Sequence, residues 1–313
     1  LPEGQGMQYK LLMALSKLVC LLPHGALLAI GKVLGHLYYC LISKQRELAI
    51  RQMMQSLAIS RSEAEHIVKA SFVNLAQNVL EILYMPRLNK DNFSKYIKID
   101  HPEYLTDSLA KGHGVVILTG HIGTWEWLAA GLVFLGMPVT AIAKPQPNMQ
   151  YTNVLNDLRA TCGVEIFSRG TSELLAAARA LRKGKILGFL ADQDGGPAGA
   201  FVEFFGRTAS TPMGPAVFSR KFKSPVVPTF ILRQPDGGHL IHVLPPMELH
   251  DTGDPDRDLI EDTADMTHII EDIIRQNPTQ WLWFQHRWNT PPDEKTVHHH
   301  VTAREGEADG KKG

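Results

Sequence analysis

The chain has 313 residues, of which 44% are hydrophobic and 20% charged, and its 32 Lys and Arg side chains balance its 32 Asp and Glu side chains. A chain of this size buries a large core, and its composition excludes a disordered, collagen-like or coiled-coil protein. The zero net charge gives no general attraction to nucleic acid, so partners must be recognised at local sites. Cys20, Cys40 and Cys162 share no CxxC spacing. We expect them to be buried thiols in a reducing compartment, without a disulfide or zinc site.

The first part of the chain predicts amphipathic helices. Residues 1–6 precede the first Met and are expected to be an artificial or unstructured start. From Lys10 to Ile42 the sequence is dense in apolar residues, but Lys17, Pro23 and Lys32 interrupt it. No window therefore reaches the 18 or more apolar residues of a clear membrane-spanning helix. The pattern favours two helices around Pro23, each with an apolar side and a basic side, as in helices that lie in a membrane interface.

The region expected to contact a membrane spans residues 7–58, and the charge of the first third of the chain also favours this contact. Between Met7 and Glu103 there are 12 Lys and Arg residues and seven Asp and Glu residues, a net charge of +5 within a neutral chain. That sign is attracted to anionic lipid surfaces. The alternative is an apolar helical hairpin that packs on the protein's own core.

The following sequence predicts an α/β domain over residues 59–292. Ser60 and Glu63 form an S-x-x-E capping box, and helical apolar spacing continues to just before Pro86. Short apolar segments then alternate with helix-like ones, which predicts a mixed central sheet flanked by helices. A final helix is expected over about 256–276, and the polar tail, 293–313, is expected to be disordered. The expected strands are 96–100, 115–120, 138–144, 164–167, 185–192, 200–205, 225–232 and 239–244.

The sequence LTGHIGTWEW, residues 118–127, contains the strongest candidate site. His121 follows a buried strand and precedes a helix, where open α/β sheets build active sites. Glu126 lies one turn into that helix, so its carboxylate is expected to accept a hydrogen bond from one imidazole nitrogen and make the other a better base. Gly120 and Gly123 are expected to let a substrate approach the backbone. The alternative is a histidine that caps the helix beside an unrelated glutamate.

This stretch resembles the H-x4-D/E motif of glycerolipid acyltransferases. Its GH-x-G-x-WE form is similar to the late lipid A acyltransferases, the lauroyl and myristoyl transferases, and to the related phosphatidylinositol mannoside acyltransferases. The resemblance extends from about Lys10 to Pro292. It includes, in chain order, Arg159 in NDLRATCG, Asp192 and Asp194 in LADQDGGP, the predicted turn over 204–216, and the ending QWLWFQHRW, residues 280–288.

The resemblance implies a glycerolipid acyltransferase-like fold and an O-acyltransferase. The implied donor is a thioester of acyl carrier protein or coenzyme A, and the implied acceptor is a membrane glycolipid, first of all a lipid A precursor. Phosphatidylinositol mannoside or another glycolipid is the alternative acceptor. The implied place is the cytoplasmic face of a bacterial inner membrane, as a peripheral or monotopic protein or one with a single N-terminal anchor. No metal or bound cofactor is expected. An acyl thioesterase and a catalytically silent membrane-binding protein are the alternatives from other classes.

The implied reaction gives each site residue a task. His121 deprotonates the acceptor hydroxyl, and Glu126 orients the imidazole of His121. Asp192 or Asp194 assists His121 or holds Arg159, the alternative being a plain Asx turn. Arg159, or backbone N–H groups after Phe205, would stabilise the oxyanion.

Three further residues, Gly123, Thr124 and Arg207, complete the expected substrate-binding set, with Arg207 as a phosphate ligand. Trp281 and Trp283 are expected either at a membrane interface or in the core. Members of the lipid A branch often have a His followed by two Arg in the terminal motif, whereas this chain has Gln285-His286-Arg287. Because of this departure, the resemblance assigns no role to His286 or Arg287.

Overall fold

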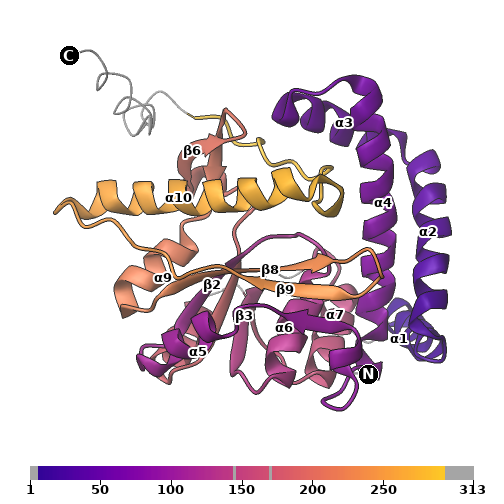
Figure 1. Ribbon diagram of the computed structural model, residues 1–313, viewed down its shortest axis with the longest axis horizontal. Coiled ribbons are helices and arrows are strands. Elements are labelled where there is room, and N and C mark those ends of the chain that lie inside the picture. The colour runs from indigo at the N-terminus through magenta and orange to yellow at the C-terminus, as the bar shows by residue number, and fades with distance from the viewer. Residues whose placement is uncertain (1–5, 144–145, 169–170, 293–313) are drawn as a thin grey trace.

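A computed structural model describes residues 6–143, 146–168 and 171–292, so almost all of the predicted start and the whole predicted tail lie outside the described residues. The chain forms an α/β body with a group of N-terminal helices along one side (Figure 1). The helices are α1 (Met7–Val19), α2 (His24–Leu41), α3 (Ser43–Leu57), α4 (Arg61–Tyr84), α5 (Glu103–Ala110), α6 (Trp125–Phe134), α7 (Met149–Thr161), α8 (Thr171–Arg182), α9 (Gly214–Phe222) and α10 (Pro255–Gln276). The strands are β1 (Ile97–Ile99), β2 (Val115–Thr119), β3 (Val139–Ala143), β4 (Glu165–Ser168), β5 (Ile186–Leu190), β6 (Ala200–Phe204), β7 (Arg207–Thr211), β8 (Val226–Arg233) and β9 (His239–Val243).

Seven strands form one sheet in the order β1-β9-β8-β2-β5-β3-β4. Paired strands are parallel except β8 and β9, which form an antiparallel hairpin. The predicted mixed central sheet flanked by helices is therefore confirmed. One strand was not predicted, because β7 lies in the expected turn over 204–216. Its sequence, RTAST, lacks apolar alternation, and it becomes a strand by pairing with β6 in a hairpin outside the sheet.

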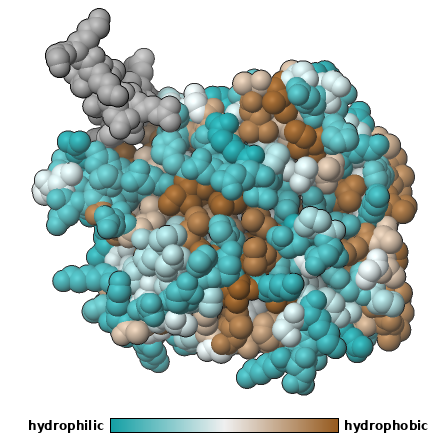
Figure 2. Space-filling model, in the orientation of Figure 1, coloured by the Kyte–Doolittle hydropathy of each residue, from teal (hydrophilic) through white to brown (hydrophobic). Residues whose placement is uncertain are grey.

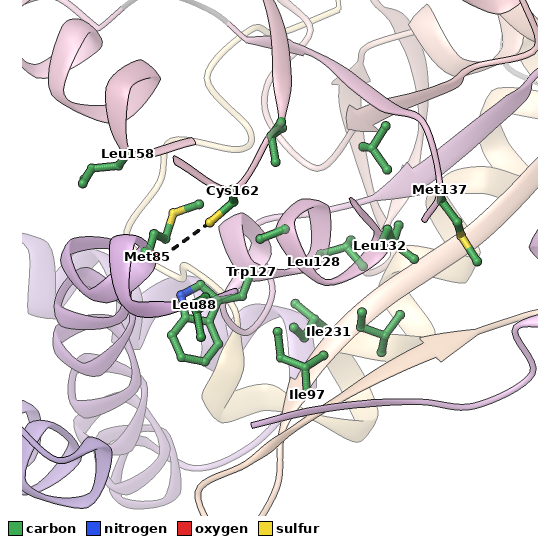
Figure 3. Close-up of a cluster of buried hydrophobic side chains, with 14 of the residues drawn as sticks. Met85, Leu88, Ile97, Trp127, Leu128, Leu132, Met137, Leu158, Cys162 and Ile231 are labelled. Atoms are coloured by element: carbon green, nitrogen blue, oxygen red, sulfur yellow. Dashed lines mark hydrogen bonds between the residues drawn. The ribbon is translucent and has the colours of Figure 1, made fainter. Parts of the chain in front are cut away.

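The sheet is buried on both faces. Two clusters of buried hydrophobic side chains cover its two faces, and successive residues of β2 belong to them in turn. Val115 and Ile117 lie in the first cluster, and Val116 and Leu118 lie in the second. In Figure 1, α5, α6 and α7 lie on one side of the strands and α9 and α10 on the other. Figure 3 shows the first cluster, in which Trp127, Leu128 and Leu132 of α6 lie against hydrophobic side chains of the sheet such as Ile97 and Ile231.

Helix α4 begins and ends where the sequence predicts. The Ser60 hydroxyl accepts a hydrogen bond from the backbone N–H of Glu63 at 3.3 Å, and the Glu63 carboxylate accepts one from the backbone N–H of Ser60 at 3.0 Å. The helix ends at Tyr84, and Pro86 lies in the short 3-10 turn that follows. This 24-residue helix contributes to both hydrophobic clusters and so connects the two layers.

The N-terminal helices have one packed face and one exposed face. Helix α2 lies so close to α4 that a Cβ on Gly35 would be 2.4 Å from the Cα of Val73, and Leu27 is fully buried. The opposite faces of α1 and α2 leave large apolar side chains exposed, and Figure 2 shows hydrophobic residues along the edge where these helices lie. The exposed apolar residues of α1, α2 and the turn between them include Met7, Leu11, Leu15, Leu18, Leu21, Ile30, Val33, Leu34, Leu37 and Leu41. The packed faces agree with the alternative of a helical hairpin on the protein's own core, and membrane contact of the exposed faces stays a prediction.

The described helices contain no single one that is long and apolar enough to cross a membrane. Helices α2 and α3 together have sufficient length and apolar character, but they meet at an angle of 93°.

The expectation of three buried thiols is wrong for Cys40, which lies exposed on α2; Cys20 is half-buried and Cys162 is buried. All three thiols are free. Burial raises the pKa of Cys162 to about 11, and its thiol donates to the carbonyl of Met85 (Figure 3). A thiol with so high a pKa is not a nucleophile at neutral pH.

Candidate active site at the carboxyl end of the sheet

Two neighbouring parallel strands bring His121 and Asp192 together. Thr119, the last residue of β2, pairs with Leu190, the last residue of β5. His121 and Asp192 each follow two positions later, so they leave the sheet side by side at its carboxyl edge. This is the edge at which open α/β sheets place their ligands.

The two side chains are joined by a hydrogen bond. The Nδ1 atom of His121 lies 2.8 Å from Asp192 Oδ1, and the backbone N–H of His121 donates to Oδ2 at 2.9 Å. The Asp192 side chain is fully buried, whereas 18% of the His121 side chain is exposed. Burial raises the pKa of Asp192, but the charge of His121 and hydrogen bonds from His121 and Trp281 outweigh it and hold the pKa at about 2. Asp192 is therefore an anion that fixes the imidazole with Nε2 directed elsewhere. Nε2 forms no hydrogen bond within the described residues.

Glu126 does not contact His121 as the spacing predicts. Its two carboxylate oxygens accept hydrogen bonds from Nε and Nη2 of Arg159, at 2.7 and 2.5 Å, and no hydrogen bond joins it to His121 in the described part of the chain. Burial lowers the pKa of Arg159, but the hydrogen bond and charge of Glu126 more than compensate and raise it. The helical position of Glu126 directs its side chain toward α7 rather than back to the loop. The carboxylate partner of the histidine is Asp192, one of the two residues that the sequence suggested for that task.

The glycines near His121 make room for atoms of this chain. A Cβ on Gly120 would lie 3.1 Å from Cγ of Asp192. Gly123 has a φ of +57°, and a Cβ there would lie only 2.0 Å from the carbonyl oxygen of Ile231. The expected space for a substrate beside these two residues is thus occupied by Asp192 and β8. The Thr124 hydroxyl is also turned inward, 2.7 Å from a carboxylate oxygen of Glu81.

Glu81 is the centre of a buried polar cluster that sequence reasoning missed. Its carboxylate accepts hydrogen bonds from His24 and His239, both at 2.9 Å, and from Arg233 at 2.7 and 2.8 Å. Burial raises the pKa of Glu81, but the charge and hydrogen bond of His239, with hydrogen bonds from His24 and Arg233, hold it well below its ordinary value. Burial lowers the pKa of His239 itself.

Ligand atoms of His24, Glu81 and His239 lie within 4.8 Å of one another, close enough to hold a metal ion. However, a guanidinium nitrogen of Arg233 lies 3.5 Å from Nε2 of His239 and bonds to the same carboxylate. A metal ion there would be repelled by a fixed positive charge, so we interpret the cluster as a structural ion pair with two imidazole donors.

Arg207 lies between α3 and the terminal segment. Its guanidinium donates to Gln55 and Ser56, both at 2.8 Å, and stacks on the ring of Trp288 at 3.4 Å. Burial lowers its pKa. Both terminal nitrogens of Arg207, which the sequence suggested as a phosphate ligand, thus donate to side chains of α3. The backbone N–H of Phe205, near the expected oxyanion donors, donates to Glu271.

Asp194 is separated from Asp192 in its contacts. Its carboxylate accepts hydrogen bonds from the hydroxyl of Thr290, at 2.7 Å, and from the backbone N–H of Gly196, at 3.3 Å, the latter as in an Asx turn. In the terminal motif, Arg287 is buried and donates to Ser210 and Thr211, while His286 is exposed. Burial lowers the pKa of Arg287 to about 10, although Asp192 and Asp194 raise it.

The terminal segment also contributes Trp281, whose indole N–H donates to Asp192 Oδ2 at 2.8 Å. Trp281 and Trp283 are both fully buried, so the core alternative for these tryptophans is confirmed. Nothing in the sequence marks Trp281 as a partner of Asp192, since the two are 89 positions apart. Asp192, in contrast, becomes predictable once β5 is placed beside β2.

Comparisons with known proteins identify the family of the chain. The family model described as bacterial lipid A biosynthesis acyltransferase matches residues 5–290. The chain is 25% identical to the lipid A biosynthesis lauroyltransferase of Escherichia coli K12 over 283 residues, 88% of this chain and 89% of that one. It is 25% identical to a lipid A biosynthesis acyltransferase of Haemophilus influenzae, covering 90% of each chain. It is 24% identical to the phosphatidylinositol mannoside acyltransferase of Mycolicibacterium smegmatis, covering 72% of this chain and 73% of that one. Because the family model matches nearly the whole chain, this protein belongs to the bacterial lipid A biosynthesis acyltransferase family and is an acyltransferase.

Proposed function

We propose that the protein transfers a fatty acyl chain from an acyl carrier protein or coenzyme A thioester to a hydroxyl of a membrane glycolipid, most simply a lipid A precursor. The observation that carries the proposal is the His121–Asp192 pair, a partly exposed imidazole fixed through Nδ1 by a buried carboxylate. This arrangement leaves Nε2 to accept a proton, as general base catalysis requires.

The reaction proceeds in two steps. Nε2 of His121 takes the proton of the acceptor hydroxyl while the oxygen attacks the thioester carbonyl carbon, giving a tetrahedral oxyanion. The C–S bond then breaks, the ester remains on the acceptor, and the imidazolium returns its proton to the leaving thiolate. Asp192 stabilises the imidazolium between the two steps, since its anionic carboxylate lies 2.8 Å from Nδ1.

Glu126 and Arg159 have a supporting role in this proposal. Their bidentate pair joins the first turn of α6, directly after the His121 loop, to α7. It fixes the direction in which α6 leaves that loop. The expectation that Arg159 stabilises the oxyanion stays a prediction, as does a substrate-binding role for Thr124 and Arg207.

We further propose that α1 and the outward face of α2 lie against the cytoplasmic face of a bacterial inner membrane. The exposed leucines of these helices support a lipid contact. Gln8 accepts a hydrogen bond from Asn148, and the backbone N–H of Tyr9 donates to Gln150 at the start of α7. Helix α7 follows β3 at the carboxyl edge of the sheet, so the apolar face adjoins the edge that carries His121. An acceptor held in the bilayer would therefore have a short path to the base.

The phosphatidylinositol mannoside acyltransferases among the relatives favour a second acceptor class, since the same His121–Asp192 pair would serve any glycolipid hydroxyl. An acyl thioesterase would use that pair to activate water instead.

The test is transfer by the purified protein from acyl-carrier-protein and acyl-CoA donors to vesicles that contain a lipid A precursor or a phosphatidylinositol mannoside. Mass spectrometry of the products reports the acceptor and the added chain together. We expect an acylated lipid with wild-type protein and a loss of at least about a hundredfold with His121→Ala. Free fatty acid without an acylated lipid would indicate a thioesterase. Near-wild-type rates for folded His121→Ala would contradict the assignment of the base.

A further inference from the structure

Trp281 contacts Asp192 through its indole N–H and Ile122, the residue after His121, through its backbone. We infer that Trp281 is a positioning residue for acyl transfer, which fixes Asp192 through its indole N–H and the His121 loop through its backbone. The inference rests on the proposed function, in which His121 is the base.

The first contact is with the carboxylate. Asp192 Oδ2 accepts hydrogen bonds from the backbone N–H of His121 at 2.9 Å and from Trp281 Nε1 at 2.8 Å, and the Gln285 amide lies 3.4 Å away. Because the Asp192 side chain is fully buried, water cannot replace a missing donor. The indole thus prevents the carboxylate from rotating away from Nδ1 of His121.

The second contact is with the loop that follows the base. Ile122 and Trp281 form an isolated antiparallel bridge, and the backbone N–H of Gly123 donates to the carbonyl of Gln280 at 2.9 Å. The Trp281 carbonyl is itself held by the Ser71 hydroxyl of α4 at 2.9 Å. The segment around Trp281 is therefore attached to the helical layer on one side and to the His121 loop on the other.

The indole also affects the charge available to the imidazole. An N–H donor stabilises the carboxylate, so that less of its charge acts on His121. Arg287, from the terminal segment, also faces Asp192, and Asp194 lies beside Arg287. The substitution Trp281→Phe removes neither of these charged groups. Loss of the indole N–H should therefore leave more of the carboxylate charge to act on the imidazole and remove one of the hydrogen bonds that fix the carboxylate's orientation.

The experiment compares Trp281→Phe with Trp283→Phe. Trp283 is also fully buried, its ring lies 4.8 Å from that of Trp281, and its indole donates to Pro278 rather than to Asp192. Each variant thus removes one indole N–H from the same aromatic cluster. We expect Trp281→Phe to lower kcat about tenfold with little change in KM, and to move the acidic limb of the kcat profile up by as much as about one pH unit. Trp283→Phe should show neither change.

Two further measurements separate the possible failures. If His121→Ala is inactive but Trp281→Phe and Trp283→Phe have the same kcat and the same pH profile, the inference is wrong and the proposed function stands. If folded His121→Ala retains activity, the proposed function fails and the inference fails with it.

Should either Phe variant not fold, wild-type protein with 15N-labelled tryptophan gives the answer by NMR. The indole N–H signal of Trp281 should shift with pH in step with the acidic limb of the kcat profile, and that of Trp283 should not. A Trp281 signal that is independent of pH over that limb would overturn the inference.

Discussion

The Asp192 carboxylate is buried and still ionised, because each group that hydrogen-bonds to it is a donor. His121, through its ring and its backbone N–H, and Trp281 together replace the water that burial removes. Asp194, two positions later, instead binds Gly196 and Thr290. Two aspartates that look equivalent in the sequence thus have different environments, and only Asp192 is placed to influence a proton on His121.

The first prediction concerns stability in acid. The pKa of Asp192 is about 2 in the folded protein and 3.8 in an unperturbed carboxyl. The lowered pKa contributes about 2 kcal/mol to the free energy of unfolding above pH 4, and this contribution is lost as the pH falls through about 2. Asp192→Asn should therefore weaken the fall in stability between pH 5 and pH 2.5, as measured by urea unfolding. Asp194→Asn serves as the control. An unchanged acid dependence in Asp192→Asn would show that the folded carboxylate is not stabilised as described.

At the scale of elements, the loop between β2 and α6 is fixed from two directions. Gly123 donates to Gln280 through its backbone N–H and accepts from the Asn78 amide at 2.7 Å through its carbonyl. Its Cα lies against the carbonyl of Ile231. The loop that presents His121 is therefore part of the rigid core and not a mobile lid.

The second prediction follows from that loop. Gly123→Ala should destabilise the protein by about 3 kcal/mol or more and abolish most transfer, because its Cβ would collide with the backbone of β8. Gly136→Ala is the matched control, since Gly136 also has a positive φ, of +86°, but nothing lies within 4 Å of its Cβ position. That variant should lose only about 1 kcal/mol, the cost of the backbone conformation alone. Thermal unfolding and transfer rates report both effects. Equal losses in the two variants would contradict the close packing at Gly123.

The third prediction concerns two glutamates of α4. Glu81→Ala leaves Arg233 buried without its anion, and we expect a loss of about 3–5 kcal/mol in the free energy of unfolding. Glu65 lies on the same helix, but its ion pair with Arg61 is exposed. Glu65→Ala should change stability little. Urea unfolding of the two variants measures the difference, and a small effect of Glu81→Ala would show that Arg233 finds another partner.

The sequence predicts single elements better than their partners. The capping box and the spacing after it locate α4, and apolar runs locate the strands of the sheet, because these signals are local. The strand β7 has no such signal. The contact between His121 and Asp192 depends on the order of strands, and that between Asp192 and Trp281 on how the terminal segment folds back. Glu126 illustrates this limit of sequence-based prediction. Its spacing from His121 permits a contact between the two side chains, but its position on α6 directs its carboxylate to Arg159.

At the scale of the whole molecule, the N-terminal helices are both a layer of the body and a candidate membrane surface. Helix α2 is packed along α4, and His24 at its start bonds to Glu81. Removing the helices would therefore expose α4 and disrupt the Glu81 cluster. Substitutions on the outward face test the membrane proposal without that damage.

The fourth prediction is that serine in place of Leu11, Leu18 and Leu21 weakens binding to anionic vesicles while leaving the unfolding temperature nearly unchanged. Each leucine that enters the lipid should contribute roughly tenfold to partitioning. The control places serine at Leu135 and Val217, which are also exposed but lie away from α1 and α2. Leu135 follows the last residue of α6, and Val217 lies in α9. Binding by wild-type protein should weaken but not vanish as salt rises, because only the attraction of the lysines is screened. Vesicle sedimentation measures both effects, and equal binding by the two sets of variants would argue against a membrane contact of α1.

The Glu81 cluster also bears on the synthesis of the protein. The carboxylate is neutralised by Arg233 and bonded by His239, which lies 158 positions further along the chain. While a ribosome has made only α1 to α4, Glu81 has neither partner, and burying it between α2 and α4 would be unfavourable. We therefore expect the N-terminal helices to stay loosely packed against one another until β8 and β9 have left the ribosome. If the proposed membrane contact holds, a nascent chain would meet lipid early through the exposed leucines of α1 and α2, but these helices would reach their packed form only together with a nearly complete sheet.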